Sequence, residues 1–123
     1  MFSDKQLIQI FEKSNGHCHF CGDKLILKKY AWRDLNDLKG AWEIDHVIQR
    51  GKGGRNDLTN CLPACTQCNR LRWHRKGPAM RELIVLGLIA KHEIKKKSSL
   101  GKTLTSLKKN RMDENKKRRR QLG

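Results

Sequence analysis

Acidic residues are scarce in this sequence relative to basic ones. There are 12 Asp and Glu residues against 28 Lys and Arg residues, so the formal net charge is +16 and the pI is near 10.1. Solubility does not require so large an excess of positive charge. The imbalance predicts a polyanionic partner, and nucleic acid is the commonest one. A structural or protein-interaction adaptor is disfavoured, because that function leaves the charge unexplained.

Aromatic residues and long apolar runs are scarce as well. Aromatics make up 6% of the chain, which disfavours a helix that binds a membrane surface through an aromatic-rich apolar face. The apolar run at residues 83–90 is well short of the length needed to cross a bilayer. The first residues lack the basic and then apolar order of a signal peptide. We therefore expect an intracellular, cytoplasmic protein with no membrane partner.

The sequence also contains little material for a hydrophobic core. Hydrophobic residues account for 37% of the chain and charged residues for 33%. Chains of this kind usually need a disulfide or a metal ion to stabilise the fold. Five cysteines are present without an export signal. In a reducing compartment, paired cysteines are better interpreted as metal ligands than as disulfides.

Local patterns predict short elements in the first two thirds of the chain. Ser3 begins a pattern typical of a capped amphipathic helix that stops at Asn15-Gly16. Short strands are expected at residues 24–30 and 42–48. A helix is expected from Cys65 until Lys76-Gly77. Trp42 and Trp73 are expected to serve packing, since that is the commoner role of tryptophan.

The last third is expected to differ from the rest. Pro78 suits the first turn of a helix whose dense apolar positions predict packing on the remainder of the domain. Beyond residue 96 the composition becomes polar and basic, and the end, N-K-K-R-R-R-Q-L-G, is expected to be disordered when unbound. The sequence therefore predicts a domain at residues 1–96 and a partly helical or disordered basic tail at residues 97–123.

Two cysteine pairs have the same spacing, Cys18-x-x-Cys21 and Cys65-x-x-Cys68. This spacing lets both thiolates of a pair reach one metal ion, and two pairs complete a tetrahedron typical of structural zinc. The two pairs would tie a loop near the N-terminus to the helix after Cys65. Cys61 remains outside this set, and we expect it to be a small buried apolar residue.

Histidines flank the first pair and need an interpretation of their own. His17 and His19 could each replace a cysteine on the metal ion, but the matched cysteines argue against it. We expect each to be exposed to solvent or to form a hydrogen bond near the metal ligands. His74 lies off the helix face that carries Asn69, which argues against metal binding by His74.

Four further polar residues fall in segments that a hairpin would bring together. Asp45 and His46 occupy the middle of an expected buried strand, where a carboxylate needs partners. Asp45 and Asn69 would offer two oxygen ligands to one hard divalent cation. His46 would face the opposite side, where an imidazole can act as a base on water. Asn60 would fix the His46 ring or hold the loop behind it.

The run D-H-V-I-Q-R-G-K-G-G-R-N-D-L-T-N-C-L-P-A-C-T-Q-C-N, at residues 45–69, resembles the ββα-metal motif of the HNH endonucleases. More narrowly, it resembles the branch in which paired C-x-x-C zinc knuckles surround the motif. The resemblance covers about residues 16–77. It implies an α+β fold, namely a small zinc-stapled ββα-metal core (treble-clef-like, His-Me finger) with an N-terminal helix and C-terminal helices.

The resemblance also implies roles for individual residues. Asp45 and Asn69 would hold a catalytic metal ion, His46 would be the general base and Asn60 would orient it. The last motif position, often histidine in this family, is Asn69 here. An amide oxygen is a harder ligand than imidazole, so Mg²⁺ or Mn²⁺ is expected at this site and Zn²⁺ at the cysteines.

The implied activity is hydrolysis of phosphodiester bonds in DNA, expected to be double-stranded and recognised with little sequence preference. The tail would add affinity through counterion release. Basic residues near the motif are expected to contact phosphates, and these are Arg50, Lys52, Arg55, Arg70, Arg72 and Arg75. The alternative is a non-catalytic, zinc-stabilised nucleic-acid-binding module, which would have no use for Asp45, His46 and Asn69 together. The sequence leaves the oligomeric state open.

Overall fold

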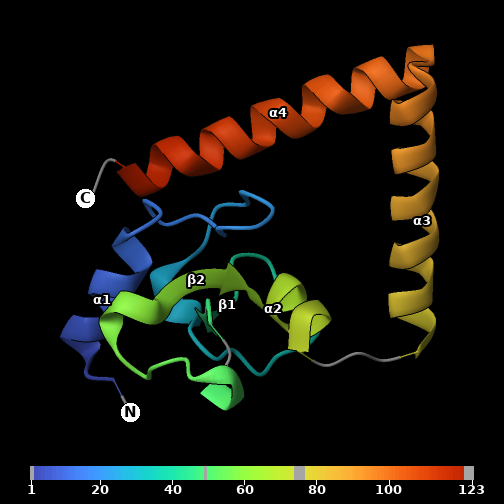
Figure 1. The fold of residues 1–123 in the computed structure, drawn as a ribbon. Coiled ribbons are helices and arrows are strands. Elements are labelled where there is room, and N and C mark those ends of the chain that lie inside the picture. Colours follow the sequence, from blue (N-terminus) through green and yellow to red (C-terminus); the bar gives the residue numbers. More distant parts are fainter. Residues whose placement is uncertain (1, 49, 74–76, 121–123) are drawn as a thin grey trace.

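The computed structural model describes residues 2–48, 50–73 and 77–120 (Figure 1). Over these residues the chain forms an α+β structure with a two-stranded antiparallel sheet, which confirms the predicted fold class. In chain order the helices and strands are α1 (Asp4–Glu12), β1 (Trp42–His46), β2 (Cys61–Cys65), α2 (Thr66–Trp73), α3 (Gly77–Lys96) and α4 (Ser99–Arg120). Single turns of 3-10 helix occur at Leu27–Lys29, Arg50–Lys52 and Leu58–Asn60.

Helix α1 begins and ends where the sequence predicts. The Ser3 hydroxyl accepts a hydrogen bond from the backbone N–H of Gln6, and the Gln6 side chain accepts one from the backbone N–H of Ser3. This capping box satisfies two of the free N–H groups at the helix start. Asn15 and Gly16 then adopt positive φ angles of 53° and 71° and reverse the chain. A side chain at Gly16 would also meet the ring of Phe11, so glycine is required there.

The hairpin of β1 and β2 organises the small core. Trp42 pairs with Cys65 and His46 with Cys61, so the two strands are aligned end to end. Trp42 is fully buried against Ile10 and the ring of Phe11. Successive side chains of a strand point to opposite faces. The face opposite Trp42 therefore carries Glu43 and Asp45, and it is this face that α2 approaches.

The segment at residues 24–30 is not the strand that the sequence predicts. Lys24 forms an isolated bridge with His17, and Tyr30 forms one with Trp42. Between these bridges, residues 27–29 make a 3-10 turn. The two ends of the segment pair with different partners, so no single neighbouring strand keeps it extended.

The last two helices also depart from expectation. Helix α3 has no buried residue among those described and packs mainly against α4 instead of the core. Helix α4 continues as far as Arg120, although disorder was predicted from residue 115 on; residues 121–123 lie outside the described part. Pairs spaced four residues apart, Lys109 with Asp113 and Glu114 with Arg118, support this helix. Within the described residues, no helix is both long and apolar enough to cross a membrane.

The chain leaves the core along α3 and returns to it along α4 (Figure 1). The Arg111 guanidinium donates a hydrogen bond to the carbonyl of Cys21 at 2.6 Å. The buried Asn115 amide donates one to the carbonyl of Phe20 at 2.9 Å. The C-terminal half of α4 is thus attached to the loop that carries the first cysteine pair, which explains why its charge does not keep it unfolded.

Candidate metal centre and active site

The four predicted zinc ligands lie together. The sulfur atoms of Cys18, Cys21, Cys65 and Cys68 are all within 4.8 Å of one another. The first pair lies in the loop after α1, and the second lies at the end of β2 and in the first turn of α2. Backbone N–H groups of Phe20, Asp23 and Cys68 donate to three of the sulfurs at 3.4 Å, as suits thiolate ligands. This cluster can hold one tetrahedral metal ion and confirms the predicted grouping.

Electrostatics within the cluster favours a bound cation. Hydrogen bonds from the thiols of Cys65 and Cys68 lower the pKa of Cys18 far below its usual value. Burial is the main cause that raises the pKa of Cys21 to about 12. The hydrogen bond with Cys18 raises the pKa of Cys68 as well. Four thiolates so close together therefore need a metal ion to neutralise them. Cys61 lies in the hydrophobic core, apart from this cluster.

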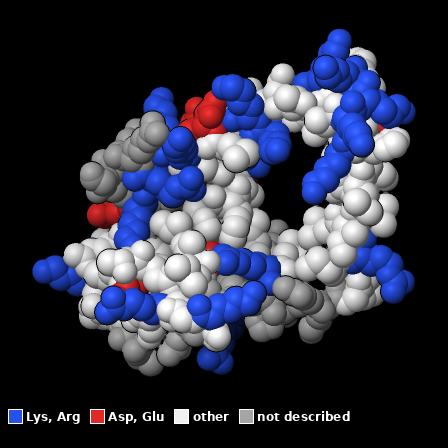
Figure 2. Space-filling view, in the orientation of Figure 1, with Lys and Arg blue, Asp and Glu red and all other residues white. Residues whose placement is uncertain are grey.

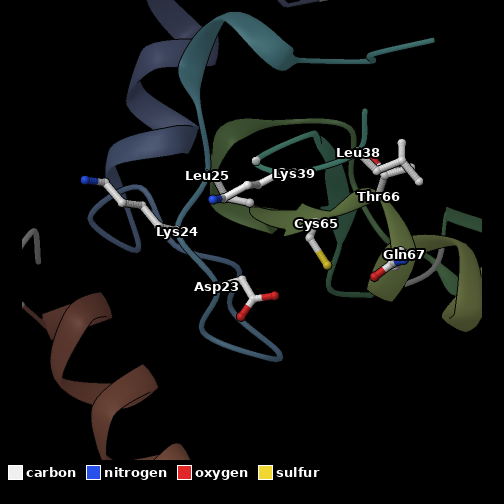
Figure 3. A pocket seen from close by; sticks show the side chains of 9 residues that line it. Asp23, Lys24, Leu25, Leu38, Lys39, Cys65, Thr66 and Gln67 are labelled. Atoms are coloured by element: carbon white, nitrogen blue, oxygen red, sulfur yellow. The ribbon is translucent and has the colours of Figure 1, made fainter. Parts of the chain in front are cut away.

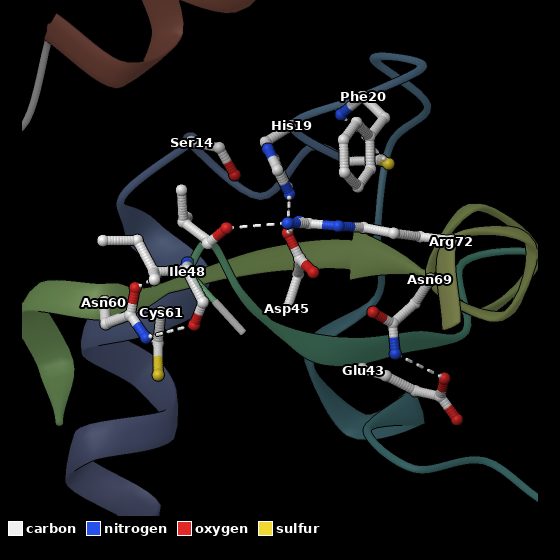
Figure 4. A network of polar contacts seen from close by, with 12 residues as sticks. Ser14, His19, Phe20, Glu43, Asp45, Ile48, Asn60, Cys61, Asn69 and Arg72 are labelled. Carbon is white, nitrogen blue, oxygen red and sulfur yellow. Dashed lines mark hydrogen bonds and ion pairs between the residues drawn. The ribbon is translucent and has the colours of Figure 1, made fainter. Parts of the chain in front are cut away.

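Asp45 is the centre of a polar network on the inner face of the hairpin (Figure 4). Its side chain is fully buried. One carboxylate oxygen, Oδ2, lies 2.8 Å from Nε2 of His19 and 2.6 Å from the guanidinium of Arg72. The other terminal nitrogen of Arg72 donates to the carbonyl of Val47 at 2.7 Å. The carboxylate is therefore fixed by the loop of the first cysteine pair and by α2 at once.

Asn69 lies on the same face of α2 as Arg72, one helical turn earlier. Its amide nitrogen donates to Glu43 at 3.0 Å. Its carbonyl oxygen is buried and has no hydrogen-bond partner among the described residues. Glu43 and Asp45 share a face of β1, just as Asn69 and Arg72 share a face of α2. The two pairs are in contact, so the structure brings Asn69 to the neighbourhood of Asp45 (Figure 4).

His46 points away from Asp45, as adjacent residues of a strand do. Its Nε2 atom lies 2.8 Å from the side-chain oxygen of Asn56. Because an amide oxygen can only accept, this contact assigns the proton to Nε2 in the neutral ring and leaves Nδ1 as the acceptor. The ring is only partly buried, so it can be reached from solvent.

Asn60 holds the loop that follows β1 and does not touch the His46 ring in the contacts described. Its side-chain oxygen accepts a hydrogen bond from the N–H of Ile48 at 2.9 Å. Its amide nitrogen donates to the carbonyls of Ile48 and Arg55 at 3.0 and 2.8 Å. Asn60 is buried, and its side chain supplies hydrogen bonds to backbone groups of the loop that have no strand partner. Of the two roles considered from the sequence, the structure shows the contact with the loop.

The basic residues expected to bind phosphate differ in their exposure to solvent and in their partners. Lys52 and Arg55 are exposed on the loop, and Arg55 pairs with Asp57 at 3.2 Å. Arg70 is exposed and lies 3.6 Å from Glu43. Arg72 faces inward to Asp45, which the sequence did not predict. The side chain of Arg50, the side chain of Trp73, and residues His74 and Arg75 lie outside the described part.

Three residues of the network were missed as site residues by sequence reasoning, and they are His19, Glu43 and Asn56. Glu43 could have been found, since strand alternation places it on the face of Asp45. His19 was assigned only to solvent or to a hydrogen bond near the metal ligands, and nothing in the sequence pairs it with a residue 26 positions later. Asn56 lies in a glycine-rich loop whose path follows from no local pattern.

A hollow of about 510 Å³ lies on another side of the cysteine cluster (Figure 3). It is lined by residues 23–25, 38–40 and 65–67. None of Asp45, His46 and Asn69 contributes to it. Cys65 belongs to the lining of the hollow, and the hollow plays no part in the polar network.

Basic side chains far outnumber acidic ones on the visible surface (Figure 2). Lys and Arg side chains gather on the core and along α4, and few acidic side chains interrupt them. A surface with this excess of positive charge attracts polyanions. It is the electrostatic pattern expected of a protein that binds nucleic acid.

Comparison with known proteins agrees with this geometry. Residues 18–75 match the model of the HNH endonuclease family. The prophage-derived protein YoqL of Bacillus subtilis (strain 168), whose name assigns it to the HNH endonucleases of SPbeta, is 33% identical over 55 residues. That alignment covers 45% of this chain and 22% of the length of YoqL. No solved structure gave a significant match. Over residues 18–75 the chain is therefore similar to the domain that defines the HNH endonuclease family.

Proposed function

We propose that this protein is a metal-dependent DNA endonuclease whose reaction takes place between β1 and α2. The observation that supports the proposal is the placement of Asp45 and Asn69 in one neighbourhood between β1 and α2 (Figure 4). A buried carboxylate faces a helix on which a buried amide oxygen has no hydrogen-bond partner among the described residues. Leaving such an oxygen unpaired costs about 1–3 kcal/mol, so a ligand for it is expected.

The donor atoms fit a hard divalent cation. Mg²⁺ and Mn²⁺ prefer carboxylate and amide oxygens, and they commonly keep several water molecules besides one or two protein ligands. Asp45 and Asn69 would hold the cation. Arg72 and His19, which contact the Asp45 carboxylate, would keep that carboxylate in position. When bound, the cation would stabilise the charge that develops on the phosphate and on the leaving oxygen.

His46 would act as the general base in this reaction. Asn56 holds its Nε2 atom, so the Nδ1 atom is the one that can take a proton from water. Asn60 would act on His46 indirectly, because it fixes residues 48 and 55 of the loop that contains Asn56. Asn56 and Asn60 are thus proposed as positioning residues.

The cysteine cluster would bind one structural Zn²⁺. All four thiolates would be ligands, so no position would remain for a substrate. Zinc would hold the loop of residues 18–21 against β2 and α2, and through His19 it would support Asp45. Because the ligands must be reduced thiols, we expect the protein to work in a reducing compartment such as the cytoplasm.

The expected substrate is double-stranded DNA recognised mainly through its phosphates. Lys52, Arg55 and Arg70 are exposed around the proposed centre, and α4 adds a further row of basic residues. Contacts of this kind give affinity without sequence information. Binding should therefore weaken strongly between low and physiological salt.

Plasmid cleavage tests the proposal directly. Supercoiled plasmid is incubated with purified protein in Mg²⁺, in Mn²⁺ and in EDTA, beside the variants His46→Ala, Asn69→Ala and His92→Ala. We expect nicking only with a divalent cation, a loss of about 10²–10⁴-fold in rate for His46→Ala, and no change for the control His92→Ala, which lies on α3. Equal nicking by wild type and His46→Ala would refute the assignment of the base.

The alternative function is nucleic-acid binding without cleavage. The cysteine cluster and the basic surface support it, but neither requires Asp45, His46 and Asn69. If the wild-type protein retards DNA in a gel-shift assay and cuts in none of these metals, this alternative replaces the endonuclease.

A further inference from the structure

The side-chain amide of Asn69 is turned with its nitrogen toward Glu43 and its oxygen toward Asp45 (Figure 4). The nitrogen donates a hydrogen bond to Oε1 of Glu43 at 3.0 Å. The oxygen has no hydrogen-bond partner among the described residues. Only the oxygen can be a ligand of a cation, because an amide N–H₂ group donates and offers no lone pair. The orientation of this amide therefore decides whether Asn69 can hold the proposed divalent cation.

The Asp45 carboxylate by itself would favour the opposite orientation. Asp45 forms an ion pair with Arg72, and an ionised carboxylate accepts hydrogen bonds but cannot donate them. In the absence of a cation, an amide nitrogen turned toward Asp45 would gain a charge-assisted hydrogen bond, whereas an amide oxygen turned toward it gains none. The observed orientation of Asn69 therefore needs a competing acceptor at the other end of the amide.

Glu43 is that competing acceptor. It lies on β1 two residues before Asp45, so both side chains share the face that α2 approaches. Its Oε1 atom accepts from Asn69, and its Oε2 atom lies 3.6 Å from the guanidinium of Arg70. Arg70 and Asn69 are neighbours on α2, so this helix contacts both oxygens of the Glu43 carboxylate.

We propose that Glu43 is a positioning residue, which fixes the amide of Asn69 so that its oxygen is available to the divalent cation. This role rests on the proposed function, because it requires a cation between β1 and α2. Glu43 would not be a ligand itself, since α2 contacts both of its oxygens. Hydrogen bonds to an ionised acceptor are about twice as strong as those to a neutral one. A carboxylate at position 43 can therefore compete with Asp45 for the amide nitrogen.

A neutral amide at position 43 would reverse the preference. In Glu43→Gln, the new side chain can accept from the Asn69 nitrogen as glutamate does, but it can also donate to the Asn69 oxygen. The second arrangement turns the Asn69 nitrogen toward Asp45, where it gains the charge-assisted hydrogen bond. The apparent affinity for the cation then falls in proportion to the fraction of molecules that still present the oxygen.

Binding of Mn²⁺ tests the proposal without reference to cleavage. The full-length protein is first loaded with zinc, so that the cysteines are occupied, and free Mn²⁺ is then measured by electron paramagnetic resonance during a titration. We expect Glu43→Gln to weaken Mn²⁺ binding about tenfold, the low end for loss of a residue that orients a metal ligand. Both variants that replace a glutamate by glutamine should keep the near-UV circular dichroism of wild type, because the two side chains have the same size.

The matched control is Glu93→Gln on α3. The Glu93 side chain is 22% exposed and that of Glu43 is 23% exposed, and each contacts a basic side chain. Each also accepts a hydrogen bond from a polar side chain. Glu93→Gln should bind Mn²⁺ with the affinity of wild type, so a loss in both variants would contradict a specific role of Glu43.

A second background separates orientation from charge. In the Asn69→His variant the ligand is an imidazole, which carries a nitrogen at either edge of the ring and no oxygen that can be turned away. Its N–H group can donate to glutamate or to glutamine at position 43. In this background Glu43→Gln should therefore weaken Mn²⁺ binding far less than it does beside asparagine. An equal loss in both backgrounds would mean that Glu43 acts on the cation through its charge or as a ligand, which overturns the positioning role.

NMR of the zinc-loaded protein without Mn²⁺ observes the orientation directly. The side-chain amide protons of Asn69 are identified by their absence in Asn69→Ala. We expect nuclear Overhauser contacts of these protons with the Glu43 side chain in wild type, and with the Asp45 side chain in Glu43→Gln. Unchanged contacts in Glu43→Gln would overturn the proposal.

The two proposals fail separately. If Asn69→Ala binds Mn²⁺ as tightly as wild type does, the cation site of the proposed function is wrong. If Asn69→Ala weakens binding and Glu43→Gln does not, the cation site stands and only the role of Glu43 is wrong.

Discussion

The carboxylate of Asp45 and the guanidinium of Arg72 are 2.6 Å apart, and Asp45 is fully buried whereas the Arg72 side chain is 30% exposed. The arginine thus lies at the edge of the network, with its charged end directed inward. A buried carboxylate is stable only when it is paired and hydrogen-bonded. Arg72 and His19 supply those partners from two elements that are far apart in the chain.

Removing the Arg72 side chain should destabilise the fold. Arg72→Ala leaves a buried carboxylate without its guanidinium, and we expect a loss of about 3 kcal/mol in the free energy of unfolding, the low end for a broken buried pair. Urea unfolding of zinc-loaded protein measures this change. The control Arg55→Ala removes an exposed arginine from a surface ion pair and should leave the urea midpoint unchanged. Equal midpoints for both variants would contradict the structural role of Arg72.

Metal removal should unfold the domain. Zinc bound by four thiolates contributes about 10–16 kcal/mol of apparent binding free energy, which is comparable to the whole stability of a small domain. We expect a strong chelator to abolish the tryptophan near-UV circular dichroism signal. Metal analysis should find one zinc ion per chain in wild type and in Cys61→Ala, and none in Cys68→Ala. A stoichiometric zinc content in Cys68→Ala would show that the cluster is not the binding site.

Loss of the Asn60 side chain should loosen the loop after β1. Asn60→Ala removes three hydrogen bonds to the backbone of Ile48 and Arg55, so we expect a loss of about 2–3 kcal/mol in the free energy of unfolding. Asn56→Ala removes only the contact with His46 and should leave the urea midpoint close to that of wild type. If both variants matched wild type, Asn60 would have no part in holding this loop.

A methyl group at Gly101 should disturb the corner between α3 and α4. Alanine there would overlap the carbonyl group of Glu93, and such overpacking costs about 1–3 kcal/mol. The thermal midpoint should fall, and protease cleavage near residues 97–98 should become faster. Gly77→Ala adds the same methyl group to α3 in open space and should cause neither effect. Faster cleavage in both variants would indicate that the corner is not closely packed.

Residue spacing predicted the parts of the structure that depend on it. The two C-x-x-C pairs come together as expected, because ligands with this spacing can satisfy one metal only in a single arrangement. The capped helix after Ser3 and the strand at Trp42 were also predicted, since capping and apolar residues are local signals. The position of Cys61 in the core follows from the same kind of pattern.

Partners that are distant in the sequence were not predicted. Arg72 was expected to contact phosphate because it is near the motif in the sequence, but the register of α2 over β1 directs it to Asp45. The end of α4 was expected to be disordered from residue 115 on, yet Asn115 donates to a carbonyl group of the cysteine loop, as Arg111 does one turn earlier. Such contacts depend on how helices, strands and loops pack against one another, and amino-acid composition does not determine that packing.

Two hydrogen-bond partners of Asp45 are 26 residues before it and 27 residues after it. Translation delivers these three segments one after another, starting from the N-terminus. A nascent chain that ends before Arg72 has neither the guanidinium for Asp45 nor, if it ends before Cys65, the second half of the metal cluster. Prematurely terminated products should therefore remain unfolded and be open to proteolysis along their whole length.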